Sequence, residues 1–167
     1  DPQHANGLRQ GITTLILGLD GMSFAPLSPE NYLIHRQYLG GLLGDPPEDL
    51  DMSSVTAFRA NYHKKVALNT AYLVPQGTVR LEVAGFRDVP LDEEAMKKAK
   101  RLVREGIEQG AVGFSTGGAY YPGPWGDTQE FIELCKTVKE MDSIYVAEPR
   151  RANAERAFGG DGVLEAL

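Results

Sequence analysis

The sequence contains a single cysteine, Cys135, so it cannot form a disulfide within the chain. Cys135 falls on the apolar stripe of an expected helix, where we expect it to be buried and unreactive. A lone thiol suits a reducing compartment, and we expect the protein to be cytoplasmic. The sequence has no recognisable signal peptide and no apolar run near the ~20 residues that cross a bilayer, so we expect no membrane partner.

Basic residues are also scarce, because 17 lysines and arginines stand against 23 acidic residues, for a net charge of -6. No basic patch with interleaved aromatic residues is present, so we expect no nucleic-acid partner. Nucleotide-binding glycine motifs are missing as well. No GxGxxG follows a first strand, and no lysine follows Gly117 and Gly118 at P-loop spacing.

The 167 residues are enough for one domain with a real hydrophobic core. The chain starts at Asp1 rather than at a methionine, and residues 161–167 resemble the opening turn of a helix that stops early. We therefore expect residues 1–167 to form a single partial domain that belongs to a longer protein.

Four short runs of apolar and β-branched residues predict buried strands. They cover residues 13–17, 66–74, 111–115 and 144–147. Between them, the pattern predicts helices over residues 28–40, after Ser53, over residues 90–109 with Asp92 as N-cap, and after Asp127.

Two local features complete this pattern. Glu130 follows Asp127 by three residues, as in a capping box. Residues 78–84 fit either a half-exposed strand or one or two helical turns.

This alternation of strands and helices is typical of an α/β fold with parallel strands joined by right-handed crossovers. Two architectures fit it, an open doubly wound sheet and about half of a (β/α)8 barrel. In both, chemistry lies where strands end. Asp20 follows the first strand in this way, although an aspartate before Gly21 also fits a plain turn. Residues 116–126, rich in glycine, proline and aromatic residues, form either a functional loop or a structural lid.

Three stretches of the sequence resemble the N-acyl-D-amino-acid deacylases, or D-aminoacylases, of the amidohydrolase superfamily. They are residues 10–27, 69–80 and 108–128, and the last contains Gly-Ala-Val-Gly-Phe-Ser-Thr-Gly. The resemblance covers essentially the whole chain. It implies about half of a TIM-like (β/α)8 metal-dependent hydrolase barrel, without the first strand and the C-terminal half.

The resemblance implies zinc as cofactor, with a metal-activated water that attacks the amide of an N-acyl-D-amino acid. Asp20 occupies the position of a family cysteine ligand, and Glu148 that of a histidine ligand, so both are the expected metal ligands. Gln76 replaces a histidine that many members have. The His-x-His pair would lie before Asp1 and the aspartate base beyond Leu167, so no catalytic residue is assigned, and zinc binding by this chain is doubtful.

Tyr120 matches the aromatic position of the family's substrate-facing loop, and Ser115 lies in the same block, so both are expected to bind substrate. Neither Ser115 nor Thr116 has a histidine partner, which argues against a serine nucleophile. His35 and His63 are expected to be structural or exposed.

Three functions stay open. The first is a deacylase of linear amides, with the isolated chain inactive. The second is a degenerate, non-catalytic barrel fragment that serves as a structural or association module, and the third is a cyclic-amide hydrolase such as a dihydroorotase-like enzyme. Half a barrel would leave two strand edges open, so we also expect self-association.

Overall fold

The computed structural model of the chain describes residues 3–150, Val163 and Ala166, so most of residues 161–167 lies outside the described residues. Its elements follow in the order α1 (Ala5–Arg9), β1 (Thr14–Leu17), α2 (Pro29–Leu43), α3 (Val55–Ala60), β2 (Asn69–Pro75), α4 (Gln76–Ala84), α5 (Glu93–Glu108), β3 (Gly113–Gly117), η1 (Gly123–Trp125), α6 (Thr128–Glu140) and β4 (Ile144–Glu148). In this described part, no helix is both long and apolar enough to cross a membrane.

The four strands form one parallel sheet in the order β1-β2-β3-β4. Each strand therefore lies beside the one that precedes it in the chain. A doubly wound sheet reverses its strand order at a switch point, whereas consecutive strands of a (β/α)8 barrel do not. The topology thus favours the barrel among the two architectures that the sequence left open.

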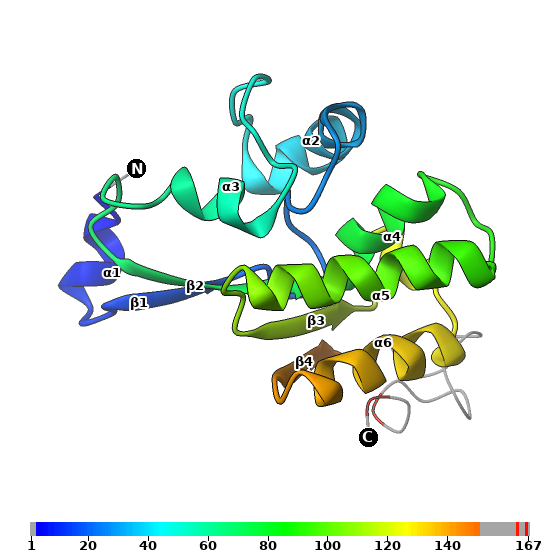
Figure 1. Ribbon diagram of the computed structural model, residues 1–167. Coiled ribbons are helices and arrows are strands. Elements are labelled where there is room, and N and C mark those ends of the chain that lie inside the picture. The colour runs from blue at the N-terminus through cyan, green and yellow to red at the C-terminus, as the bar shows by residue number, and fades with distance from the viewer. Residues whose placement is uncertain (1–2, 151–162, 164–165, 167) are drawn as a thin grey trace.

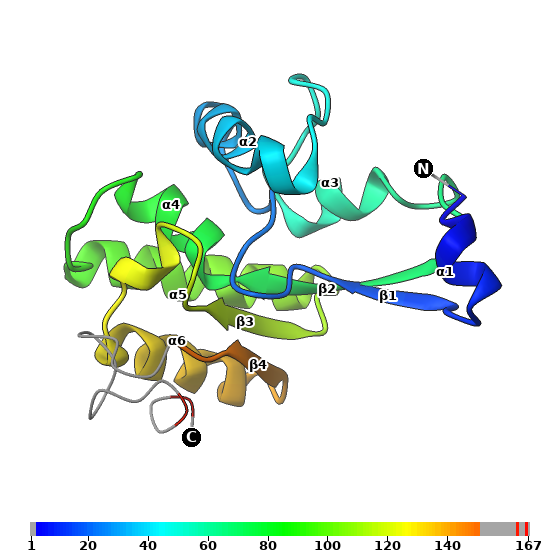
Figure 2. The same cartoon turned by 180° about the vertical axis from the view of Figure 1, so that it is seen from behind.

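Helices α5 and α6 lie on one face of the sheet. Figure 1 shows α5 and α6 in front of the strands, and Figure 2, from behind, shows the strands in front of these helices. Tyr72, Val74 and Phe114 are buried in the core. Ile16 and Ile144, which alternate with the core-facing positions, are 50% and 52% exposed. The face of the sheet that carries Ile16 and Ile144, opposite to the helices, is the one that would point into a closed barrel.

The capping residues set the helix starts much as the sequence predicts. Asp92 accepts a hydrogen bond from the Ala95 backbone N–H at 2.8 Å, so α5 begins at the next residue. The cap of α3 is Ser54 rather than Ser53, because the Ser54 hydroxyl accepts from the Ala57 N–H. Residues 78–84 belong to helix α4, and the short helix α1 was not expected.

Two strands are displaced from their predicted positions. The second begins at Asn69 rather than at Val66, because its partner β1 begins only at Thr14, with which Asn69 is in register. The third covers Gly113–Gly117 rather than residues 111–115. The Ala111 N–H still bonds to the Gly106 carbonyl at the end of α5, so the strand starts later.

Candidate functional site

The chain leaves β1 at Gly18 and crosses the carboxyl ends of β2 and β3. A Cβ atom at Gly18 would lie 2.3 Å from the Leu73 carbonyl oxygen, and one at Gly21 would lie 2.6 Å from the Gly117 nitrogen. Both residues also have positive φ, 78° and 66°. Glycine is therefore required at each of these two positions by close approach and by conformation.

Ser115 of β3 forms hydrogen bonds to the segment that follows β1. Its hydroxyl donates to the Gly18 carbonyl and accepts from the Gly21 N–H at 3.2 Å. The Gly77 N–H donates to the Gly21 carbonyl at 2.8 Å, which ties the same turn to α4. Ser115 is fully buried, so this part of the sheet end is held firmly by hydrogen bonds.

Asp20 and Glu148 lie at the same end of the sheet. The Asp20 carbonyl oxygen lies only 1.8 Å from the position of a Cβ on Gly117, and Gly117 is in register with Glu148. Both acidic residues are partly exposed. The segments that carry Asp20, Glu148 and the loop after β3 therefore meet at the carboxyl end of the sheet, where the sequence analysis expects the chemistry of either α/β architecture. This arrangement does not test whether either carboxylate binds a metal.

The loop between β3 and α6 is anchored at both of its sides. The Tyr121 N–H donates to the Tyr38 hydroxyl at 3.1 Å, and Trp125 packs against Tyr121 with ring centroids 4.8 Å apart. Arg150, just after β4, donates to the carbonyls of Gly126 and Pro124. Its guanidinium also lies over the Phe131 ring, 4.6 Å from the centroid.

Tyr120 lies in the middle of this anchored loop and is partly exposed. Its carbonyl accepts from the Gly123 N–H at 3.1 Å, which closes the turn before η1. The cavity that Gly117, Glu148 and Arg150 help to line has a volume of about 10 Å³, room for one water at most. A substrate would therefore have to lie outside this small cavity.

A buried ion pair between Arg80 and Glu130 lies next to this loop. Gln76, directly after β2, donates to a Glu130 carboxylate oxygen at 2.6 Å, and Arg80 pairs with the other oxygen. Burial raises the pKa of Glu130, while the positive charge of Arg80 opposes this rise. The Glu130 N–H donates to the Asp127 side chain at 2.8 Å, as the predicted capping box requires, but the Glu130 carboxylate binds Gln76 and Arg80. The sequence did not predict that Arg80 and Arg150 lie at this end of the sheet.

The remaining histidines and the cysteine have no features of reactive groups. His35 is 1% exposed, and burial lowers its pKa to about 4, against a smaller opposing effect of the Ser23 backbone. Cys135 is half-buried, and burial raises the pKa of its thiol to about 11. His63 is exposed. His35 is therefore a neutral packing residue and Cys135 a protonated thiol at neutral pH.

The donor set at the carboxyl end does not by itself make a zinc site. Within residues 3–150, Val163 and Ala166, no group of three or more histidine, cysteine, aspartate or glutamate residues could hold a metal ion. A catalytic zinc normally has three protein ligands and an open position. Asp20 and Glu148 could contribute two carboxylates, so the described residues alone do not fit a zinc centre.

No family model matches the sequence. Three proteins of Alcaligenes xylosoxydans xylosoxydans are similar to it, and one of them, an N-acyl-D-aspartate deacylase, is 30% identical over 151 residues, 89% of this chain and 29% of that protein. An N-acyl-D-glutamate deacylase is 33% identical over 158 residues, which cover 93% of this chain and 31% of that protein. A D-aminoacylase is 28% identical over 156 residues, 86% of this chain and 29% of the enzyme. The chain thus spans about a third of the length of the relatives it matches.

Solved structures agree with these relatives. The chain resembles the N-acyl-D-glutamate deacylase of Bordetella bronchiseptica complexed with zinc and a phosphonate inhibitor, with a TM-score of 0.78 and 29% identity. This match covers 95% of our chain and 32% of the other. A D-aminoacylase assigned to a novel subset of amidohydrolases matches with a TM-score of 0.70 and 25% identity, over 87% and 30% of the two chains. These matches confirm the fold of a partial amidohydrolase barrel and zinc as a metal of the family.

Proposed function

Since this chain is homologous to the N-acyl-D-amino-acid deacylases of the amidohydrolase superfamily, we propose that it forms part of a metal-dependent hydrolase. The proposed reaction is hydrolysis of the linear amide C–N bond of an N-acyl-D-amino acid. One observation carries the proposal. The relatives match nearly the whole chain, and in it the segments with Asp20, Glu148 and Tyr120 come together where parallel strands end.

The proposed roles follow from where each residue lies. Asp20 and Glu148 would contribute carboxylate oxygens to the metal, with the remaining ligands from elsewhere in the protein. When bound, such a metal supplies Lewis-acid polarisation and an activated water. Ser115 would serve substrate binding by holding the turn beside Asp20, because its hydroxyl already makes two backbone hydrogen bonds. Tyr120 would contact the substrate from the anchored loop.

The proposed substrate class is small N-acyl-D-amino acids. Two relatives carry names that specify acidic D-amino acids, N-acyl-D-glutamate and N-acyl-D-aspartate, whereas D-aminoacylase is named without a preference. We propose residues 1–167 as a single partial barrel domain of such an enzyme. The single thiol of Cys135 supports a reducing, cytoplasmic location.

A second candidate is a non-catalytic association module. It is favoured by Glu148 and Gln76, which stand where the family resemblance implies histidines, and by the two outer strands of the sheet. β1 and β4 each pair with one neighbour among the described strands, so each has an edge that a second copy could extend. Light scattering over a wide concentration range tests this. A monodisperse monomer throughout would count against association.

The hydrolase proposal is tested with the whole encoded protein after dialysis against zinc. We expect release of free D-glutamate or another D-amino acid from the N-acetyl-D derivatives, and no release from the L enantiomers. Asp20→Ala should abolish turnover and lower the bound zinc, whereas Asp51→Ala, an exposed aspartate outside the site, should change neither. Zinc-loaded protein that hydrolyses none of the D substrates would refute the proposal.

A further inference from the structure

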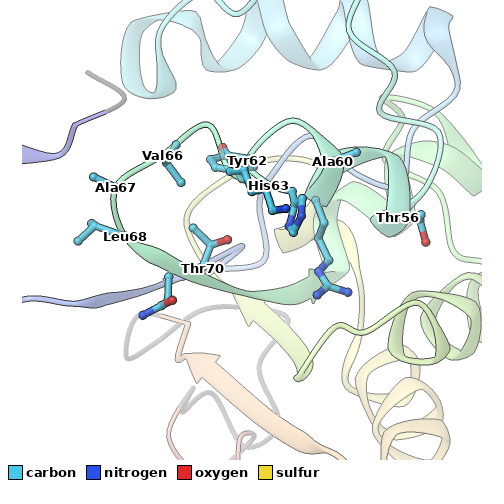
Figure 3. Close-up of a pocket in the computed structure, with 11 residues that line it drawn as sticks. Thr56, Ala60, Tyr62, His63, Val66, Ala67, Leu68 and Thr70 are labelled. Atoms are coloured by element: carbon cyan, nitrogen blue, oxygen red, sulfur yellow. The ribbon is translucent and has the colours of Figure 1, made fainter.

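A second cavity lies at the opposite end of the sheet from Asp20 and Glu148. It has a volume of about 640 Å³, within the range of pockets that hold small molecules. Figure 3 shows it between the end of α3, the turn that carries His63, and the start of β2 at Thr70. Because Asn69 and Thr70 are the first residues of the parallel strand β2 and both line the cavity, this is the amino end of the sheet, away from the proposed hydrolase site.

The charge of this cavity is opposite to that of the chain. Arg59, His63 and Lys64 line it, and none of its lining residues is acidic, although the whole chain has a net charge of -6. Among the described residues, no carboxylate forms an ion pair with Arg59 or Lys64. The positive charge is thus not neutralised by this part of the protein, and low-dielectric walls focus such a field on a bound anion.

Two parts of the cavity are ordered before any ligand arrives, the backbone of the turn that carries His63 and Lys64 and the Arg59 guanidinium. The His63 N–H donates to the Arg59 carbonyl at 3.0 Å, and the Lys65 N–H donates to the Tyr62 carbonyl at 3.0 Å, so the turn is hydrogen-bonded. The Arg59 side chain donates through Nη1 to the Gln109 carbonyl at 2.8 Å. This single bond orients the guanidinium and leaves its other N–H groups for a ligand, which lowers the entropy cost of binding.

We infer that this cavity binds a small organic anion, held through its phosphate or carboxylate oxygens by Arg59, His63 and Lys64. Arginine offers paired donors that match the geometry of both anionic groups, and lysine adds a compact positive charge. The hydroxyl of Thr70 and the apolar Val66 also line the cavity, which suits a ligand with a carbon skeleton rather than a bare ion. This inference does not depend on the proposed hydrolase function.

The test is titration of the whole encoded protein with inorganic phosphate and, separately, with citrate, followed by calorimetry and by the NMR signals of His63 and Lys64. We expect saturable binding of at least one of the two, with shifts confined to the cavity. Tighter binding of inorganic phosphate would indicate a phosphate ligand, and tighter binding of citrate would indicate a carboxylate ligand.

Lys64→Glu should weaken this binding about tenfold or more, because it replaces an attraction with a repulsion at contact distance. Lys65→Glu is the matched control, since it makes the same charge change at an exposed neighbour that does not line the cavity. It should change the affinity less than about twofold in physiological salt. His63→Ala, also at an exposed position, provides a second test if Lys64→Glu does not fold.

Two results would overturn the inference. One is the absence of saturable binding of either anion, and the other is an equal loss of affinity in Lys64→Glu and Lys65→Glu. The second result would mean diffuse attraction to a basic run rather than a site.

Discussion

Replacing His35 by leucine should remove a large part of the acid sensitivity of this fold. His35 is buried in α2 with its ring edge-on to Phe24, at a centroid distance of 6.1 Å. Among the described residues, neither ring nitrogen has a hydrogen-bond partner of normal geometry. A buried imidazole of this kind is stable only in its neutral form, and burial accordingly lowers its pKa to about 4.

The direction of the pH effect follows from proton binding. In the unfolded chain His35 has a pKa of about 6.5, so between pH 6.5 and pH 4 the unfolded state binds more protons than the folded state. Stability is therefore fully present above pH 6.5 and is lost as the pH falls toward 4. The loss amounts to roughly 2 kcal/mol at pH 5 and roughly 3 kcal/mol at pH 4.

Urea unfolding at several pH values between 7 and 4 measures this effect, with the fluorescence of Trp125, the only tryptophan, and far-UV circular dichroism as probes. Carboxylates also titrate in this range, so the relevant quantity is the difference between the wild type and His35→Leu. The matched control is His63→Leu, which makes the same substitution at an exposed histidine outside the core. Equal pH dependence in His35→Leu and the wild type would refute the reasoning.

Two further predictions concern the carboxyl end of the sheet. Glu130→Ala leaves the fully buried Arg80 without its partner and should lower the free energy of unfolding by about 3–5 kcal/mol. The double mutant Arg80→Met with Glu130→Leu should restore much of this loss. A double mutant whose loss of stability equals the sum of the two single losses would contradict the prediction. Gly21→Ala should lower the free energy of unfolding by about 2 kcal/mol or more, because the added Cβ would contact Gly117 and the residue has a positive φ. Gly41→Ala, in open space inside α2, should raise the free energy of unfolding by about 0.5–1 kcal/mol. Urea unfolding measures both variants, and equal effects would be evidence against the crowded turn.

The parts of the fold that could be predicted from the sequence are those set by neighbouring residues. The caps Asp92 and Asp127 act within three residues of their own position, and each was placed correctly. The run at residues 78–84 was ambiguous because Gln76 through Leu81 are all buried. When every face of a segment is buried, the alternation of apolar and polar residues no longer distinguishes a helix from a strand.

Partners far apart in the sequence could not be predicted in this way. Glu130 has the spacing of a capping box, and its own N–H does bond to Asp127, but its carboxylate pairs with Arg80, 50 residues earlier. Arg150 likewise has its partner far away in the sequence, since it donates to the Gly126 carbonyl 24 residues earlier. A charged residue in an otherwise apolar or glycine-rich stretch was the available signal, and only the tertiary structure identifies its partner.

The turn at Asp20 shows how backbone contacts fix the position of the candidate site independently of the chemistry of its side chain. The path of this turn is fixed by backbone contacts, since Gly21 bonds to Ser115 and Gly77, and the Asp20 carbonyl closely approaches Gly117. The Asp20 side chain does not take part in these contacts. Asp20 has a φ of 58°, and aspartate is one of the few residues that tolerate the left-handed region, so it fits this turn without added strain. The backbone path at this position therefore does not depend on the side chain, and the carboxylate determines only which metal ion the turn could bind.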